Sequence, residues 1–148
     1  MKTFFSPTAL SLVASVALLS VASAVQAHGC TVSDAAGRYG YTSTGTIVNP
    51  SVGPFTAVGY ITFTETETLS GAQTASIAGN LVEETFQGTF TVNPDCTGSA
   101  TVQVYHGMTL ARTSVIHLVW DILQNEARAI FLTPGTNISI QGRKMADN

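Results

Sequence analysis

The sequence predicts an all-β fold, namely an antiparallel eight-stranded up-and-down β-barrel, with a β-sandwich as the alternative. Beyond residue 36, turn-forming residues recur roughly every ten residues. Between the turns, apolar side chains alternate with threonine, serine and other polar side chains, as in a sheet with one solvated face. No segment keeps a helical period for three turns. A barrel is favoured because closure leaves no unpaired edge strand.

Eight strands are expected between these turns. In order, they are residues 37–44, 57–66, 68–78, 84–92, 99–105, 113–122, 128–133 and 137–142. The connections carry Asn-Pro, Gly-Asn, Asn-Pro-Asp, Gln-Asn and Pro-Gly, which are turn formers. Only the short segment 124–127 is expected to coil briefly.

The alternation of side chains justifies the individual strands. In the second strand, for example, Ile61 and Phe63 share one face while Tyr60 and Thr62 share the other. Glycines inside strands weaken a flat sheet but permit the sharp coiling that a closed barrel needs. Such glycines occur in four of the predicted strands, as Gly40, Gly59, Gly71 and Gly88.

The sixth strand departs from simple alternation. Ile116, Leu118 and Trp120 share one face, yet Val115 and Val119 make the opposite face apolar as well. An outer face of this kind predicts either a covering loop or a homo-oligomer contact. Trp120 is expected to fill one end of the core.

Residues 1–27 have the organisation of an export signal. A lysine near the start precedes an apolar run over residues 9–21, and small residues follow it. Cleavage is expected before His28 or, alternatively, before Val25. The apolar run is shorter than the roughly 20 residues that a membrane-spanning helix needs. We therefore expect a secreted or periplasmic protein whose residues 28–148 form one domain, with no membrane association after cleavage.

The two cysteines, Cys30 and Cys96, both lie in the expected mature chain. In an oxidising compartment, two cysteines in a small domain usually pair. The predicted strand order supports the pairing. Cys30 precedes the first strand and Cys96 follows the fourth, so an up-and-down barrel brings both to the same end. We predict a Cys30–Cys96 disulfide there.

The segment around the second cysteine, GTFTVNPDCTGSAT at residues 88–101, resembles a group of small secreted bacterial proteins. Their signature is Gly-Thr-Tyr-Thr-Val-Asn-x-Asp-Cys-Thr-Gly-Thr/Ser. GRYGY at 37–41 and AVGYITF at 57–63 match the earlier strands of that group. The group is similar to the allene oxide cyclase barrel-like branch of the calycins, so the resemblance implies a calycin-like barrel and export but no reaction. Phe90 replaces the usual tyrosine, and residues 64–66 replace a common Asp-Gly-x-Gly hairpin.

Charge and motifs exclude several functions. The formal net charge is −3, and the six Lys and Arg residues form no cluster, which argues against nucleic-acid binding. No Gly-x-Ser-x-Gly motif occurs, and the three histidines lack zinc-site spacing. We therefore assign no catalytic residue and expect no cofactor or metal. A copper site built on an amino-terminal His28 is a minor alternative.

Polar side chains gather at one predicted barrel end. The strand order brings Tyr41, Glu84, His106, Arg112 and Thr133 to the end away from the disulfide. These groups around a barrel mouth are suited to orienting a small ligand or moving protons. Their alternative role is that of solvated rim residues. His117, which shares a face with Val115 and Val119, is expected outside the barrel.

Three functions follow from these expectations. The first is a secreted non-enzymatic barrel that binds a small apolar or amphipathic ligand. The second is an allene oxide cyclase-like enzyme, a cyclase or isomerase, which rests on fold analogy alone. The third is a structural envelope protein with a filled core. A lumen narrowed by large side chains favours the third, whereas an open cavity with His106 or Glu84 facing inward favours the first two.

Overall fold

The computed structural model describes residues 29–49 and 53–146. The predicted signal peptide and the expected cleavage sites lie outside these residues. The elements are one short helix and eight strands: α1 (Val32–Ala35), β1 (Gly37–Ile47), β2 (Gly53–Phe63), β3 (Thr68–Ile77), β4 (Asn80–Val92), β5 (Thr97–His106), β6 (Thr109–Asp121), β7 (Glu126–Phe131) and β8 (Thr136–Lys144).

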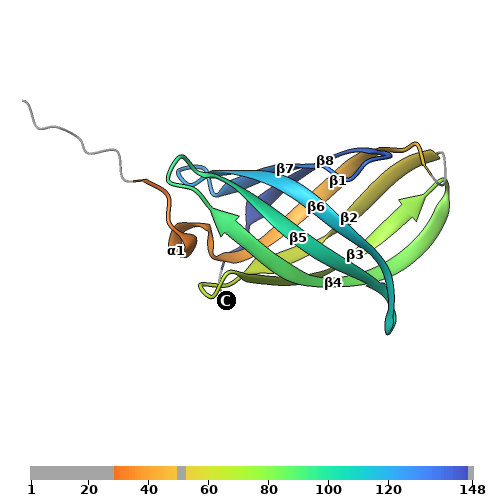
Figure 1. Cartoon of the computed structure of the whole chain (residues 1–148), viewed down its shortest axis with the longest axis horizontal. Helices are drawn as coiled ribbons and strands as arrows, with labels where there is room; N and C mark the ends of the chain where they lie inside the picture. The colour runs from red at the N-terminus through yellow and green to blue at the C-terminus, as the bar shows by residue number, and fades with distance from the viewer. Residues whose placement is uncertain (1–28, 50–52, 147–148) are drawn as a thin grey trace, which may run out of the picture.

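The strands form a closed barrel in which each strand pairs antiparallel with the next, and β8 closes on β1 (Figure 1). Tyr41 of β1, for instance, lies opposite Gly59 of β2 on one side and Gly142 of β8 on the other. This confirms the predicted eight-stranded up-and-down barrel and rules out the sandwich.

The second strand ends at Phe63 rather than at residue 66. The backbone N–H of Thr64 donates to the carbonyl oxygen of Thr68, and Glu67 has a φ of 59°, so residues 64–67 turn the chain toward β3. Threonine hydroxyls at 64 and 68 add a 2.8 Å hydrogen bond across the same turn. The β-propensity of threonine misleads the prediction here, because these threonines serve as turn residues.

One face of every strand points into the barrel and forms the core. At the disulfide end, four aromatic rings fill the lumen. Phe63 packs edge-to-face against Tyr39, Phe90 and Trp120, with ring centroids 5.7, 4.9 and 5.7 Å apart. Trp120 is 2% exposed, and its indole N–H has no hydrogen-bond partner among the described residues. Trp120 therefore fills this end of the core, as predicted.

A second cluster closes part of the opposite end. Phe55, Ala57, Ala75 and Ile138 are buried together on the β1, β2, β3 and β8 side. Most of the polar residues described below lie on the remaining side, on β3, β4, β5 and β6, which are consecutive neighbours in the barrel.

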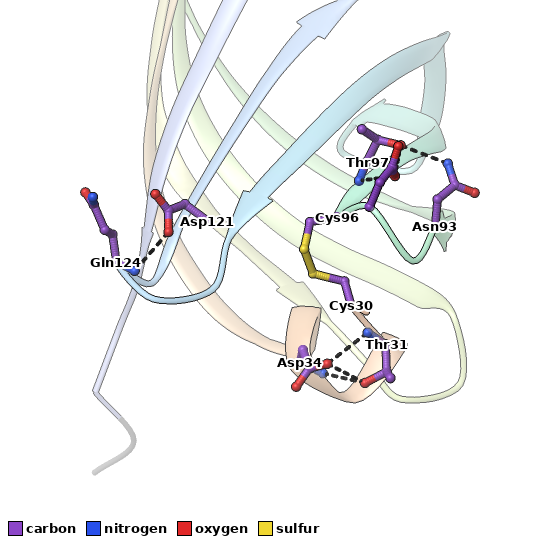
Figure 2. Close-up of a disulfide and its surroundings, with 9 residues drawn as sticks. Cys30, Thr31, Asp34, Asn93, Cys96, Thr97, Asp121 and Gln124 are labelled. Carbon is purple, nitrogen blue, oxygen red and sulfur yellow. Dashed lines mark hydrogen bonds between the residues drawn. A yellow bond between two sulfur atoms is a disulfide. The ribbon is translucent and has the colours of Figure 1, made fainter. Parts of the chain in front are cut away.

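The disulfide joins Cys30 to Cys96, as predicted, with their Cα atoms 5.0 Å apart (Figure 2). Cys30 lies just before α1 and Cys96 lies in the β4–β5 turn. The helix α1 was not predicted; it is capped by Thr31, whose side chain and backbone exchange hydrogen bonds with Asp34. Its Ala35 is fully buried, so the disulfide holds α1 against this barrel end.

Two glycines allow neighbouring strands to approach closely inside the barrel. A Cβ atom on Gly88 would overlap the carbonyl oxygen of Thr101 on the neighbouring strand, and one on Gly71 would overlap the carbonyl oxygen of Tyr60. Only glycine permits backbones to approach so closely on the inner face of the barrel.

The outer face of β6 is uncovered. Val115 and Val119 are 41% and 47% exposed, and Ile130 and Leu132 continue the apolar surface beside them. No covering loop lies over these side chains within the described residues, so self-association through this face stays a prediction. Within the same residues, no helix has both the length and the apolar character needed to span a membrane.

Candidate functional site

The candidate site is a hydrogen-bonded polar cluster inside the barrel, at the end away from the disulfide. Glu84 points inward from β4, and the register places Gln73 of β3 directly opposite it. His106 is the last residue of β5, and Arg112 lies near the start of β6. The fifth member is Tyr41 of β1.

Glu84 is the centre of the cluster. Its side chain has no exposed surface, and Arg112 holds it in a bidentate ion pair. The Nη1 atom of Arg112 lies 2.5 Å from Oε1 and the Nη2 atom lies 2.8 Å from Oε2. This fork-to-fork geometry is the strongest arrangement available to a guanidinium and a carboxylate.

The remaining acceptor capacity of Glu84 is also used. Nε2 of His106 lies 2.8 Å from Oε1, and Nε2 of Gln73 donates to Oε2 at 2.6 Å. The hydroxyl of Tyr41 in turn donates to Oε1 of Gln73 at 2.6 Å. A continuous chain of hydrogen bonds therefore crosses the barrel from β1 to β6.

The surroundings of Glu84 keep it ionised. Burial by itself raises the pKa of the carboxyl group, but hydrogen bonds from Arg112, Gln73 and His106, with the positive charge of Arg112, together lower its pKa to about 2. The pKa of Tyr41 is raised well above its ordinary value by burial and by the negative charge of Glu84, with Arg112 opposing. At neutral pH the cluster thus contains a buried carboxylate paired with Arg112 and linked through Gln73 to a neutral phenol.

A cavity of ≈ 60 Å³ lies in the lumen next to the cluster. Arg112, Gln73 and Tyr41 line it, whereas Glu84 and His106 do not. The rest of its wall is mostly apolar, with two buried serines: Tyr39, Ser43, Ile61, Phe63, Phe86, Val102, Val104, Ser114, Ile116, Leu118, Ala127, Ala129, Phe131, Ile140 and Gly142. The cavity therefore lies between the aromatic cluster and the polar cluster. Glu84 acts on it indirectly, by fixing the positions of Arg112 and Gln73.

The cluster reaches solvent on its outer side. The side chains of Arg112 and His106 are 32% and 45% exposed. Because Arg112 both lines the cavity and touches solvent, it stands between the lumen and the outside. We call this end of the barrel, beside Arg112 and His106, the mouth.

The structure brings together four of the five residues predicted for this end, namely Tyr41, Glu84, His106 and Arg112. Thr133 is separate, because its hydroxyl accepts a hydrogen bond from the backbone N–H of Val115 on β6. His117 is exposed on the outer face, where it lines a surface depression over β1, β6, β7 and β8.

Sequence reasoning missed Gln73, which links Tyr41 to Glu84. The signal was present, since Leu69, Gly71, Ala75 and Ile77 share its side of β3. A glutamine side chain that points inward among small and apolar residues needs a hydrogen-bond partner inside the barrel. Polar side chains on the neighbouring strands can provide that partner.

No group of three or more His, Cys, Asp or Glu side chains able to hold a metal ion occurs in the described part of the chain. His28, the basis of the copper alternative, lies outside it. Comparison with protein-family models, with curated proteins and with solved structures found no match to this chain.

Proposed function

We propose that this protein binds a small amphipathic molecule, with an apolar part in the lumen and a polar group at the mouth. The observation that carries the proposal is the position of Arg112. Its guanidinium is held rigid by buried Glu84, lines the apolar cavity and still reaches solvent. Binding sites commonly combine an apolar pocket with a few fixed polar groups.

The cavity limits what can enter. A cavity of about 150 Å³ is known to take up benzene, and this one measures ≈ 60 Å³. It fits the end of a linear alkyl chain and excludes a ring unless side chains move. The rest of a longer ligand would extend past Arg112 toward solvent.

Arg112 determines the kind of polar group. Among the described residues, Glu84 accepts two hydrogen bonds from Arg112, and a guanidinium has five N–H donors. The remaining donors favour a hydrogen-bond acceptor such as a carbonyl, hydroxyl or carboxylate oxygen. Because Glu84 already balances the charge of Arg112, a net negative charge on the ligand is not required.

We place this binding function outside the cytoplasm. The Cys30–Cys96 disulfide is consistent with an extracellular or periplasmic protein. The features of an export signal in residues 1–27 and the resemblance to the calycin-like secreted group support the same location. The size of the barrel is compatible with a binding role, since an eight-stranded barrel is wide enough to hold one small ligand.

Two other functions each have one observation in their favour. The contact between His106 and Glu84 next to the Tyr41–Gln73 hydrogen bond suits a cyclase or isomerase that moves a proton. Loss of turnover on changing Tyr41, Glu84 and His106 together would support that enzyme. The aromatic cluster that narrows the lumen suits a structural envelope protein, which would bind no ligand at all.

The test is a titration of ¹⁵N-labelled protein with hexanoate and with 1-hexanol, followed by NMR. Amide shifts should move for residues around the cavity. The Ala129→Leu variant fills the cavity from β7 and should weaken binding at least about tenfold, because the alkyl chain loses its space. Ala111→Leu makes the same change on the exposed face of β6 and should bind like wild type.

Two results would overturn the proposal. One is the absence of any shift around the cavity with either probe, even though the protein is folded. The other is equal binding by Ala129→Leu and wild type. Native mass spectrometry of protein purified under mild conditions adds an independent readout, since a bound amphipathic molecule should appear as a discrete mass increment.

A further inference from the structure

Exposed apolar side chains surround the mouth end of the barrel. The four connections at this end are those between β1 and β2, β3 and β4, β5 and β6, and β7 and β8 (Figure 1). In or next to these connections lie the large exposed side chains that we call the mouth rim: Val48, Leu81, Met108, Leu110 and Leu132. Met108 is fully exposed and Leu81 is 78% exposed. Thus each of the four connections presents at least one apolar side chain to solvent.

Most charged side chains lie at the disulfide end of the barrel. Among the described residues, only Glu83, Glu84 and Arg112 carry a formal charge near the mouth, and the last two neutralise each other. Every other described Asp, Glu, Lys or Arg belongs to α1, to a turn of the disulfide end or to a strand segment beside it: Asp34, Arg38, Glu65, Glu67, Asp95, Asp121, Glu126, Arg128, Arg143 and Lys144. The barrel is therefore polarised, with one charged end and one nearly uncharged apolar end.

We propose that the mouth rim docks the protein onto an uncharged lipid surface, with the barrel axis directed into solvent. Apolar side chains without nearby charges are what insert into the interface of a bilayer, while charged groups stay in water. No described lysine lies at this end, so no basic cluster is present to attract anionic lipids. The occupant that fits the rim is a zwitterionic lipid surface.

A lipid surface suits the rim better than a protein partner. Stable protein partners bury about 800 Å² on each side as one closely packed patch. The rim residues instead lie on separate connections around the barrel end, and polar residues such as Asn49, Thr109 and Thr133 lie between them. A fluid lipid interface accommodates separated side chains because the lipids rearrange around each one.

The test is cosedimentation with phosphatidylcholine vesicles. The protein is purified in its exported form, and mass spectrometry first verifies that residues 1–27 are absent. The double variant Leu81→Ser/Met108→Ser should lower the partition coefficient at least about tenfold, since two exposed apolar side chains are lost. Leu123→Ser is the matched control, because Leu123 is 96% exposed in the β6–β7 turn of the opposite end. It should bind vesicles like wild type.

Salt and lipid charge complete the test. Binding should be the same at low and high salt and should not increase with anionic lipid. The proposal is overturned if wild type does not bind, if binding needs anionic lipid, or if Leu123→Ser weakens binding as much as the double variant. It is also overturned if the rim variant instead turns a dimer into a monomer in light scattering, since the rim would then contact a second copy. The hexanoate titration addresses the lumen separately, so the two proposals can fail independently.

Discussion

At the scale of single residues, Glu84 is the centre of the buried polar cluster and has no exposed side-chain surface. Replacing it by glutamine keeps the shape but removes the charge that Arg112 pairs with. Breaking a buried ion pair from one side costs roughly 3–5 kcal/mol. We expect Glu84→Gln to lower the free energy of unfolding by about 3 kcal/mol at pH 7, measured by urea denaturation. Glu83→Gln, one position away on the outer face, should change it by less than about 0.5 kcal/mol.

The same carboxylate predicts a pH dependence. The pKa of Glu84 falls from 4.5 to about 2 on folding. Its contribution to the free energy of unfolding is therefore complete above pH 4.5 and is lost as the pH falls toward 2. The stability gap between wild type and Glu84→Gln should therefore narrow by about 3 kcal/mol between pH 6 and pH 2. A gap that stays constant over this range would mean that the ion pair does not shift the pKa as the structure indicates.

Tyr41 gives a second prediction at this scale. Its hydroxyl donates to Gln73, and Gln73 donates to Glu84. Tyr41→Phe leaves the amide oxygen of Gln73 without a donor in a mostly apolar lumen, which should cost about 1–2 kcal/mol of unfolding free energy. Tyr60→Phe removes a hydroxyl from a half-exposed ring outside the barrel and should be nearly neutral. Equal losses for the two variants would show that the hydrogen-bonded chain contributes nothing to stability.

At the scale of elements, most of the fold could be predicted from the alternation of apolar and polar side chains along the strands. All eight strands were predicted, because each has an apolar inner face and most have a polar, hydroxyl-rich outer face; β6, with exposed Val115 and Val119, is the exception. The strand order then predicted both the disulfide and the gathering of Tyr41, Glu84, His106 and Arg112. This worked because antiparallel neighbours with short turns leave little freedom in which end a residue reaches.

What the pattern missed was local or needed side-chain geometry. The helix α1 has only four residues, too few to show a helical period, and it depends on the Thr31–Asp34 cap and the disulfide beside it. Gln73 was missed because its partner lies on another strand, and only the register identifies that partner. Thr133 lies at the predicted end of the barrel but does not join the polar cluster. Its hydroxyl bonds instead to the backbone N–H of Val115, and sequence alone does not show which nearby backbone group such a hydroxyl will bind.

The close approach of strands at the inner glycines predicts how alanine substitutions in the sheet affect stability. A Cβ on Gly88 would overlap the carbonyl oxygen of Thr101, whereas a Cβ on Gly40 would meet only the flexible side chain of Met145 at 3.6 Å. We expect Gly88→Ala to destabilise the protein by about 2 kcal/mol or more. The same change at Gly40 should be neutral or slightly stabilising, since alanine restricts the unfolded chain. Thermal melts of the two variants should differ clearly in midpoint, and similar midpoints would argue against close strand approach at Gly88.

At the scale of the whole molecule, the two barrel ends differ in what they contain. The disulfide end is sealed by α1, the aromatic cluster and the Cys30–Cys96 bond, while the polar cluster and the apolar rim lie at the other end. Because the disulfide and the mouth lie at opposite ends, we expect the disulfide to stabilise the barrel without changing the mouth.

The disulfide tests this separation directly. The bond links residues 66 positions apart, and closing a loop of that length contributes about 4 kcal/mol by restricting the unfolded chain. Cys30→Ala/Cys96→Ala should lose about that much unfolding free energy in guanidinium titrations. A reductant should cause the same loss in wild type and none in the double variant. Because the bond acts far from the mouth, the side-chain NMR signal of Arg112 should stay where it is. Movement of that signal would mean that the two ends are coupled, and the mouth would then depend on the redox state of the opposite end.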